Sequence, residues 1–270
     1  MTAVDYEAEY NNRARVPEHP AVMAGWVKDA ADYRAKHPPR VLRYGPSERH
    51  RIDLFAGSSD GPVAVFIHGG YWQALDGSSF SHCARGLNAH GISVAVPTYD
   101  LCPAVSVADI ITQMRAASRE LAKLGHPLVV SGHSAGGHLA ACMLATDWAA
   151  FDASLPKNLV KAAHAISGLF DLPPLVGTSI NKALGMDPVS AEAASPLFWT
   201  APTQGSLDAV VGGNESAEYF RQSRTIVAEW GRGIAARFDT VPGANHFTAI
   251  APLADPNSAM VLRLGELARG

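Results

Sequence analysis

A serine in a glycine-rich turn, between a buried strand and a helix of small residues, limits the folds open to this chain. The apolar residues 127–130 lead into Gly132-His133-Ser134-Ala135-Gly136-Gly137, hereafter the serine turn (residues 132–137). Glycines on both sides of a serine permit strained backbone angles and close approach of neighbouring chain. The pattern predicts a sharp strand-to-helix turn that presents the serine hydroxyl at the end of a sheet. The alternative is that Ser134 only caps the following helix, because serine is a favoured N-cap.

Strand and helix candidates alternate along most of the chain. Apolar runs predict strands at 41–44, 51–55, 63–67, 93–96, 127–130, 162–167, 208–211 and 235–240. Helical spacing of apolar residues predicts helices at 79–88, at 105–124 and from the serine turn to about Trp148. This alternation favours an α/β fold, with a mostly parallel central sheet of about eight strands and helices on both faces. The first two strands are expected to pair as a hairpin, and residues 1–270 to form a single domain.

Residues 1–40 stand apart from this alternation. Val22, Trp26, Ala30 and Tyr33 recur at helical spacing before two prolines end the segment. We expect a peripheral helical segment that covers the mouth of a substrate pocket.

Composition excludes several classes of partner. The chain has 22 Lys and Arg against 25 Asp and Glu, and its net charge of −3 offers no footprint for nucleic acid or an anionic membrane. No apolar run approaches the roughly 20 residues of a membrane helix. The first residues lack the pattern of a secretory leader, and Cys83, Cys102 and Cys142 fit reduced thiols in a cytoplasm better than a disulfide framework. We therefore expect a small-molecule substrate and no metal or other cofactor, and the sequence leaves open whether two copies form a homodimer.

A second turn, after residues 63–67, offers backbone donors. His68-Gly69-Gly70-Tyr71-Trp72, hereafter the second turn (residues 68–72), ends that apolar run. The N–H groups of Gly70 and Tyr71, joined by that of Ala135 behind the serine, are the expected oxyanion hole. His68 is expected to brace the turn through its imidazole. An ordinary tight turn is the alternative.

The general base is expected near the C-terminus, because hydrolases with such a serine turn are ordered serine, acid, histidine along the chain. His246 follows the last predicted strand and meets this requirement. His133 lies within the serine turn and His138 in the following helix, so both are expected to pack around the site or support it. Their spacing does not match the H-x-x-x-H pattern of a helical metal pair.

Three carboxylates compete for the role of the acid that orients the histidine. Glu215 comes immediately after the strand at 208–211, Glu218 lies one helical turn further on, and Asp171 follows the preceding strand. Asp208 begins its strand and lies at the wrong end. Glu215 is preferred, because glutamate can fix the histidine tautomer in place of aspartate, while Asp171 and Glu218 stay open as alternatives.

With these residues placed, the chain resembles the α/β-hydrolase fold and, within it, the kynurenine formamidase (arylformamidase) group. The second turn looks like that group's HGGxW signature, and further similarity is spread over nearly the whole chain. It includes residues 10–14 (YNNRA), 99–103 (YDLCP), 167–172 (SGLFDL), 218–223 (EYFRQS) and 246–247 (HF). The match at 167–172 implies that Asp171 belongs to the shared scaffold, which weakens its claim as the acid. The chain departs from the group at Glu215-Ser216, where the group usually has aspartate before the serine.

The resemblance implies a serine hydrolase that cleaves N-formylkynurenine to kynurenine and formate. Ser134 is then expected to form a formyl-enzyme, with Tyr71, Trp72 and Phe247 binding the substrate. Packing in the core is the alternative for Trp72. A carboxylesterase for short acyl esters is the alternative function, because one fold and one set of catalytic residues serve many acyl compounds. A binding module without catalysis is disfavoured by the intact nucleophile, base and second turn.

Overall fold

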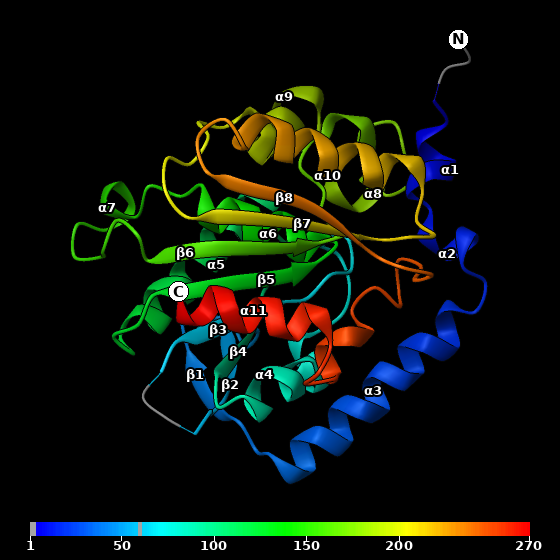
Figure 1. Ribbon diagram of the computed structural model, residues 1–270. Helices are drawn as coiled ribbons and strands as arrows, with labels where there is room; N and C mark the ends of the chain where they lie inside the picture. The colour runs from blue at the N-terminus through cyan, green and yellow to red at the C-terminus, as the bar shows by residue number, and fades with distance from the viewer. Residues whose placement is uncertain (1–3, 59–60) are drawn as a thin grey trace.

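An eight-stranded sheet forms the centre of the computed structural model, which describes residues 4–58 and 61–270 (Figure 1). The strands are β1 (Arg40–Arg43), β2 (Arg51–Phe55), β3 (Val63–Ile67), β4 (Ser93–Thr98), β5 (Leu128–His133), β6 (Val160–Ile166), β7 (Ser206–Gly212) and β8 (Ala235–Val241). Their order in the sheet is β1-β2-β4-β3-β5-β6-β7-β8. β1 pairs with β2 and β2 with β4 in antiparallel register, and all other neighbours are parallel. The predicted fold class, the strands and the antiparallel first pair are confirmed.

The central strands are buried on both faces, whereas the last strand is a half-exposed edge. Every residue of β3 and β5 is buried, as expected for parallel strands that helices cover on both sides. Leu128 and Val130 of β5 enter one hydrophobic core and Val129 the other, because successive side chains of a strand point to opposite faces. β8 instead alternates exposed and partly buried residues. The uninterrupted apolar sequence of β5 therefore makes it a central strand, and it leads directly to Ser134.

Helices cover both faces of the sheet. On one face the core includes residues of α5 (Val107–Ala122), α6 (Ala135–Leu144) and α10 (Ala217–Trp230); on the other it includes residues of α3 (His19–Lys36), α4 (Arg85–Ala89) and α11 (Ala259–Arg269). The shorter α-helices are α1 (Tyr6–Tyr10), α2 (Asn12–Arg15), α7 (Trp148–Phe151), α8 (Asn181–Leu184) and α9 (Pro188–Ala193). Short 3-10 helices occupy Gly77–Ala84, Pro173–Leu175, Pro196–Phe198 and Ala251–Ala254. Among the helices of the described residues, none has the length and apolar character needed to span a membrane.

Two helices differ from the sequence prediction. The segment predicted as one helix at 79–88 is a 3-10 helix that continues into α4. The helix after the serine turn ends at Leu144, and a separate helix, α7, begins at Trp148. The side chain of Asp147 accepts a hydrogen bond from the N–H of Ala150, so a local N-cap starts the new helix there.

The N-terminal segment lies at the side of the molecule where the parallel strands end (Figure 1). α1 is in contact with α10, and α3 packs on the 3-10 helix Gly77–Ala84. Trp26, Ala30 and Tyr33 are the buried residues of α3, at the spacing that the sequence predicts. The described part of this segment therefore lies beside the carboxyl ends of the strands, where parallel sheets bind their ligands.

Candidate active site

Ser134 lies at the junction of β5 and α6 with a strained backbone. Its φ is 57° and its ψ is −118°, a combination that residues other than glycine seldom adopt. Its N–H donates to the carbonyl of Ile166 at 2.8 Å, which ties the serine turn to β6. A Cβ on Gly136 would overlap the carbonyl oxygen of Ile67 in β3, so this glycine permits the close approach. The turn holds Ser134 at the carboxyl edge of the sheet, where the residue lines a cavity.

Glu215 and His246 form a buried pair that the chain brings to the same edge. Nδ1 of His246 lies 2.7 Å from Oε2 of Glu215. Because a carboxylate accepts hydrogen bonds, Nδ1 of His246 is the donor, and in the neutral imidazole Nε2 then keeps its lone pair. The N–H of Gly212 donates to Oε1 of Glu215 at 2.7 Å, and the hydroxyl of Ser167 donates to the same oxygen. The carboxylate is thus held in one orientation by three donors.

The other carboxylates weighed from the sequence are bound elsewhere. Asp171 pairs with Arg221 at 2.9 Å, and Glu218 pairs with the same guanidinium at 2.8 Å. Asp208 is held by Arg263 at 2.8 Å. Of these carboxylates, Glu215 is the one in contact with His246, so the longer side chain of glutamate reaches the position where the family resemblance led us to expect aspartate.

The second turn presents backbone donors that have no acceptor. Within residues 4–58 and 61–270, the N–H groups of Gly70, Tyr71 and Ala135 donate to no protein atom. Gly70 and Tyr71 line the same cavity as Ser134, and Ala135 is the first residue of α6, whose N-terminus adds positive potential. The φ of Gly70 is 107°, and a Cβ there would overlap the carbonyl oxygen of Ala74. Free donors placed beside a serine can stabilise a developing oxyanion.

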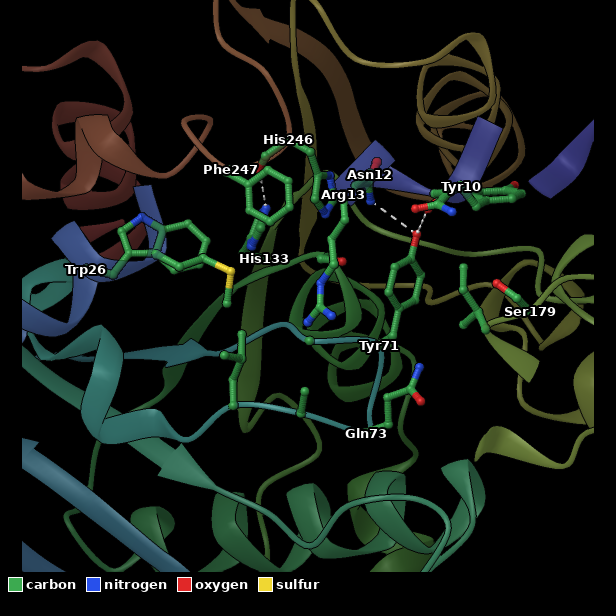
Figure 2. Close-up of a pocket in the computed structure, with 17 residues that line it drawn as sticks. Tyr10, Asn12, Arg13, Trp26, Tyr71, Gln73, His133, Ser179, His246 and Phe247 are labelled. Carbon is green, nitrogen blue, oxygen red and sulfur yellow. Dashed lines mark hydrogen bonds between the residues drawn. The ribbon is translucent and has the colours of Figure 1, made fainter. Parts of the chain in front are cut away.

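Side chains from distant segments hold the second turn. The hydroxyl of Tyr71 donates to the carbonyl of Tyr10 at 2.6 Å, and it accepts from Asn12 Nδ2 at 3.1 Å and from the hydroxyl of Tyr219 at 2.8 Å. Asn12 also donates to Tyr219 at 2.7 Å. Figure 2 shows Tyr71 rising from its loop toward Tyr10 and Asn12. We call Tyr10, Asn12, Tyr71 and Tyr219 the tyrosine cluster. Because the ring of Tyr219 lies 4.7 Å from that of His246, the cluster joins the N-terminal segment, the second turn and the histidine.

Trp72 does not lie where the sequence prediction placed it. Its side chain is fully buried, and its indole N–H donates to Nδ1 of His138 at 3.3 Å. The N–H of Cys102 donates to the carbonyl of Trp72 at 2.8 Å. Trp72 is not among the described residues that line the cavity. The prediction that Trp72 contacts substrate is therefore wrong, because tight packing against α6 turns the indole into the core.

A cavity of about 480 Å³ opens between these groups. Ser134 and His246 line it together with the aromatic rings of Tyr71 and Phe247 (Figure 2). Much of the remaining wall comes from the N-terminal segment, through Tyr10, Asn11, Asn12, Arg13, Met23 and Trp26. The expected site residues other than Trp72 and Ala135 thus meet around one cavity or, like Glu215, contact a residue that lines it.

Burial favours the neutral form of three histidines around the site, His68, His133 and His138. Burial, together with the neighbouring His246, holds the pKa of His133 well below its ordinary value. Burial also lowers the pKa of His68 and of His138 to about 4. Nε2 of His133 lies 2.8 Å from the carbonyl oxygen of His246, to which it donates, so His133 fixes the loop that carries the expected base. His68 bonds through Nδ1 to the carbonyl of Gly69 at 2.8 Å, in agreement with the bracing role expected for it.

Sequence reasoning assigned no role to the tyrosine cluster beyond Tyr71. Tyr10 and Asn12 lie within residues 10–14, and Tyr219 within residues 218–223. Both segments were singled out by the family resemblance, and that was the available signal. Nothing in the local sequence indicates that these two segments lie side by side.

The arrangement as a whole suits acyl transfer. It supplies a serine, an imidazole with an oriented tautomer and backbone donors without acceptors. In the part of the chain that the structure describes, there is no group of three or more His, Cys, Asp or Glu side chains that could hold a metal ion.

Comparison with known proteins gives consistent results over most of the chain. Residues 64–210 match a family model of the alpha/beta hydrolase fold. The kynurenine formamidase of Danio rerio is 32% identical over 226 residues, which cover 79% of this chain and 76% of that protein. The kynurenine formamidase of Drosophila melanogaster is 31% identical over 227 residues, which cover 77% of this chain and 74% of that protein. A crystal structure from Silicibacter sp. TM1040, provisionally described as that of a thioesterase, is 35% identical with a TM-score of 0.84 and covers 97% of this chain and 100% of its own.

Proposed function

The chain belongs to the kynurenine formamidase family of α/β-hydrolases, and we propose that it hydrolyses N-formylkynurenine to kynurenine and formate. One observation carries the proposal. Ser134 and the imidazole that Glu215 orients share one cavity with backbone donors that have no acceptor.

In the acylation step, Ser134 is the nucleophile and His246 the base. Oγ of Ser134 bonds to the formyl carbon as its proton passes to Nε2 of His246, and the carbonyl oxygen becomes an oxyanion. The N–H groups of Gly70, Tyr71 and Ala135 stabilise that charge. The C–N bond then breaks, and the imidazolium gives its proton to the departing aryl amine.

Deacylation uses the same groups, with water in place of the serine hydroxyl. His246 takes a proton from the water whose oxygen attacks the formyl ester, and the proton passes to Oγ of Ser134 as formate leaves. Glu215 holds the imidazole in the required tautomer and stabilises its charged form in both steps.

The walls of the cavity suit a formyl group attached to an aryl amine. A formyl carbon bears only hydrogen, so its side of the site needs little space, and the bulk of Tyr71 can close it. Phe247 lines the cavity and stacks on His19, with ring centroids 5.4 Å apart. It offers an apolar face for an aryl ring. Since the N-terminal segment supplies part of the wall, we also assign it the role of pocket cover.

A short ester or thioester is the second candidate substrate. The Silicibacter structure, which is provisionally described as a thioesterase, covers nearly the whole chain. The same nucleophile, base and donors serve ester hydrolysis, so the groups around Ser134 do not discriminate between the two classes.

The deciding experiment compares kcat/KM for N-formylkynurenine and for p-nitrophenyl acetate on the same enzyme preparation. We expect a clear preference for the formamide. A clear preference for the short ester would overturn the formamidase proposal and leave the hydrolase class intact.

We further propose that the protein acts in the cytoplasm. Cys83, Cys102 and Cys142 are all free and buried, which suits a reducing compartment. Fractionation of the producing cells, followed by detection with an antibody to the chain, tests this placement.

A further inference from the structure

A guanidinium without a carboxylate partner faces the cavity. Arg13 lines the cavity at its solvent-exposed side, and Figure 2 shows its side chain pointing inward between Phe247 and Tyr71. Within residues 4–58 and 61–270 it forms no ion pair. None of the described residues that line the cavity is an aspartate or a glutamate. The described lining of the cavity therefore carries the positive charge of Arg13 and no carboxylate.

Three partly buried arginines of the described structure have carboxylate partners, whereas Arg13 is exposed and has none. Arg34 pairs with Asp53, Arg263 with Asp208, and Arg221 with both Asp171 and Glu218. A planar guanidinium matches a carboxylate with two parallel hydrogen bonds, and this pairing is stronger than one between neutral groups. Because Arg13 lines the cavity and its guanidinium is in no ion pair of the described structure, it is available to a carboxylate that enters there.

The backbone of Arg13 is fixed although its side chain is free. The preceding residue, Asn12, donates to the hydroxyls of Tyr219 and Tyr71 at 2.7 and 3.1 Å. The side chain of Asn11 accepts from the N–H of Ala14 at 3.2 Å and caps the short helix α2. Arg13 is thus anchored to the tyrosine cluster, which also holds the second turn. A fixed anchor reduces the ordering cost of binding a ligand.

We propose that Arg13 binds a carboxylate on the leaving group of the substrate and thereby selects aryl formamides with an acidic side chain over neutral ones. The inference rests on the proposed function, because N-formylkynurenine has its carboxylate on the amino-acid side chain of the aryl ring, away from the formyl group. Arg13 then contacts a part of the substrate that does not react. Its interaction is equal in the ground state and the transition state, so its loss raises KM and changes kcat little.

The test compares Arg13→Gln with the matched control Arg15→Gln. Arg15 lies in the same helix and is exposed, and it does not appear among the described residues that line the cavity. The substrates are N-formylkynurenine and N-formylkynuramine, which differ only in the carboxylate. We expect the unaltered enzyme to prefer N-formylkynurenine by about 10- to 100-fold in kcat/KM, the value of one charge-assisted hydrogen-bonded pair. Arg13→Gln removes this preference through KM, and Arg15→Gln retains it.

Two outcomes would overturn the assignment. A preference that survives in Arg13→Gln shows that another group binds the carboxylate. An equal fall of kcat on both substrates shows that Arg13 acts on the oxyanion or on the fold, and circular dichroism of the variant separates those two causes.

Inhibition by the product separates this inference from the proposed function. If the enzyme hydrolyses p-nitrophenyl acetate but neither formamide, the proposed function fails. Kynurenine and kynuramine are then compared as inhibitors of ester hydrolysis. The Arg13 assignment holds if kynurenine binds more tightly and Arg13→Gln abolishes the difference. It falls if the two compounds inhibit the unaltered enzyme equally.

Discussion

The serine turn and the second turn have similar strained backbones that are held by different means. The φ of Ser134 is 57° and that of Tyr71 is 49°, and both turns follow strands that are buried over their whole length. Backbone packing holds the serine turn, through the approach of Gly136 to β3 and the hydrogen bond from Ser134 to β6. Side chains from the N-terminal segment and α10 hold the second turn, through the hydroxyl of Tyr71.

Because of this difference, the two turns depend to different degrees on the rest of the chain. The strain at Ser134 is compensated within the sheet, so the position of the nucleophile depends little on the rest of the chain. The strain at Tyr71 is compensated by residues of the N-terminal segment, which also supplies part of the cavity wall. A change in that segment therefore alters the pocket and the oxyanion donors together.

The largest effect is expected from removal of the proposed nucleophile. Ser134→Ala should lower kcat by about a million-fold, as expected when serine and histidine act as a unit. The fold should persist, because the serine side chain caps no helix. Ser131→Ala is the matched control, since Ser131 lies in β5, the strand that leads to Ser134, and its Oγ is buried without a hydrogen-bond partner in the described structure. Full activity in the control with most activity retained in Ser134→Ala would remove Ser134 from the mechanism.

The next largest effect concerns the proposed acid, which belongs to neither turn. Glu215→Gln should lower kcat by about 10,000-fold, because an amide does not fix the tautomer of His246 as a carboxylate does. Asp171→Asn is the comparison, and we expect it to cost less than about tenfold because that carboxylate pairs with Arg221 instead. Steady-state kinetics of both variants decides, and the reverse order would make Asp171 the acid.

The backbone of the second turn comes third. Gly70→Ala should lower kcat by about 100- to 1,000-fold, the cost of one oxyanion donor. At a φ of 107° alanine is strained, and its Cβ overlaps the carbonyl of Ala74, so the N–H of residue 70 must shift. Gly177→Ala is the control, because nothing lies within 4 Å of a Cβ there. If Gly70→Ala raises KM at an unchanged kcat, this turn shapes the pocket and does not stabilise the oxyanion.

The two turns also differ in how far the sequence predicts them. Glycine spacing after an apolar run indicated the serine turn, because its strain is relieved by residues that are adjacent in the sequence or in the sheet. The same reasoning placed Glu215 and His246 at strand ends, and the structure brings them into contact. The second turn was located, but Trp72 was misplaced. Tyr71 and Trp72 are adjacent and bulky, but they point in different directions. Tyr71 bonds to Tyr219 and faces the cavity, whereas Trp72 bonds to His138 in the core, and both partners are distant in the sequence.

A pH-dependent effect on stability is expected where the two turns meet, at His138. This residue accepts from Trp72 and lies in the helix that follows Ser134, and burial lowers its pKa to about 4. An unfolded histidine has a pKa of about 6.5. The stabilising contribution is therefore complete above pH 6.5 and is lost as the pH falls toward 4, by about 3 kcal/mol in all.

Urea unfolding at pH 7 and at pH 4 measures this contribution. In the unaltered protein the free energy of unfolding should fall between pH 7 and pH 4. In His138→Gln that fall should be smaller by about 3 kcal/mol, even if the substitution itself lowers the stability at pH 7. His126→Gln is the control, since His126 is only partly buried, and it should keep the difference seen in the unaltered protein. An unchanged difference in His138→Gln would show that protonation of His138 is not coupled to unfolding.

The smallest effect is expected from Tyr71→Phe, which tests most directly whether the two turns are held by different means. Tyr71→Phe removes the hydroxyl that joins the second turn to Tyr10, Asn12 and Tyr219. It should cost about 1–3 kcal/mol of stability, because the hydroxyl is lost while its hydrogen-bond partners stay. We expect kcat to fall by about tenfold or less, because the donors remain but lose their fixed orientation. Thermal unfolding and steady-state kinetics measure the two quantities.

Tyr6→Phe provides the control for the loss of a hydroxyl, because Tyr6 is 37% exposed. Whether kcat falls together with stability in Tyr71→Phe decides between two ways of holding the second turn. If kcat falls with stability, the N-terminal segment maintains the oxyanion donors, and the two turns depend on different parts of the chain. If stability falls at an unchanged kcat, the contacts of Trp72 with His138 and Cys102 suffice. The second turn would then be held from the core, much as the serine turn is.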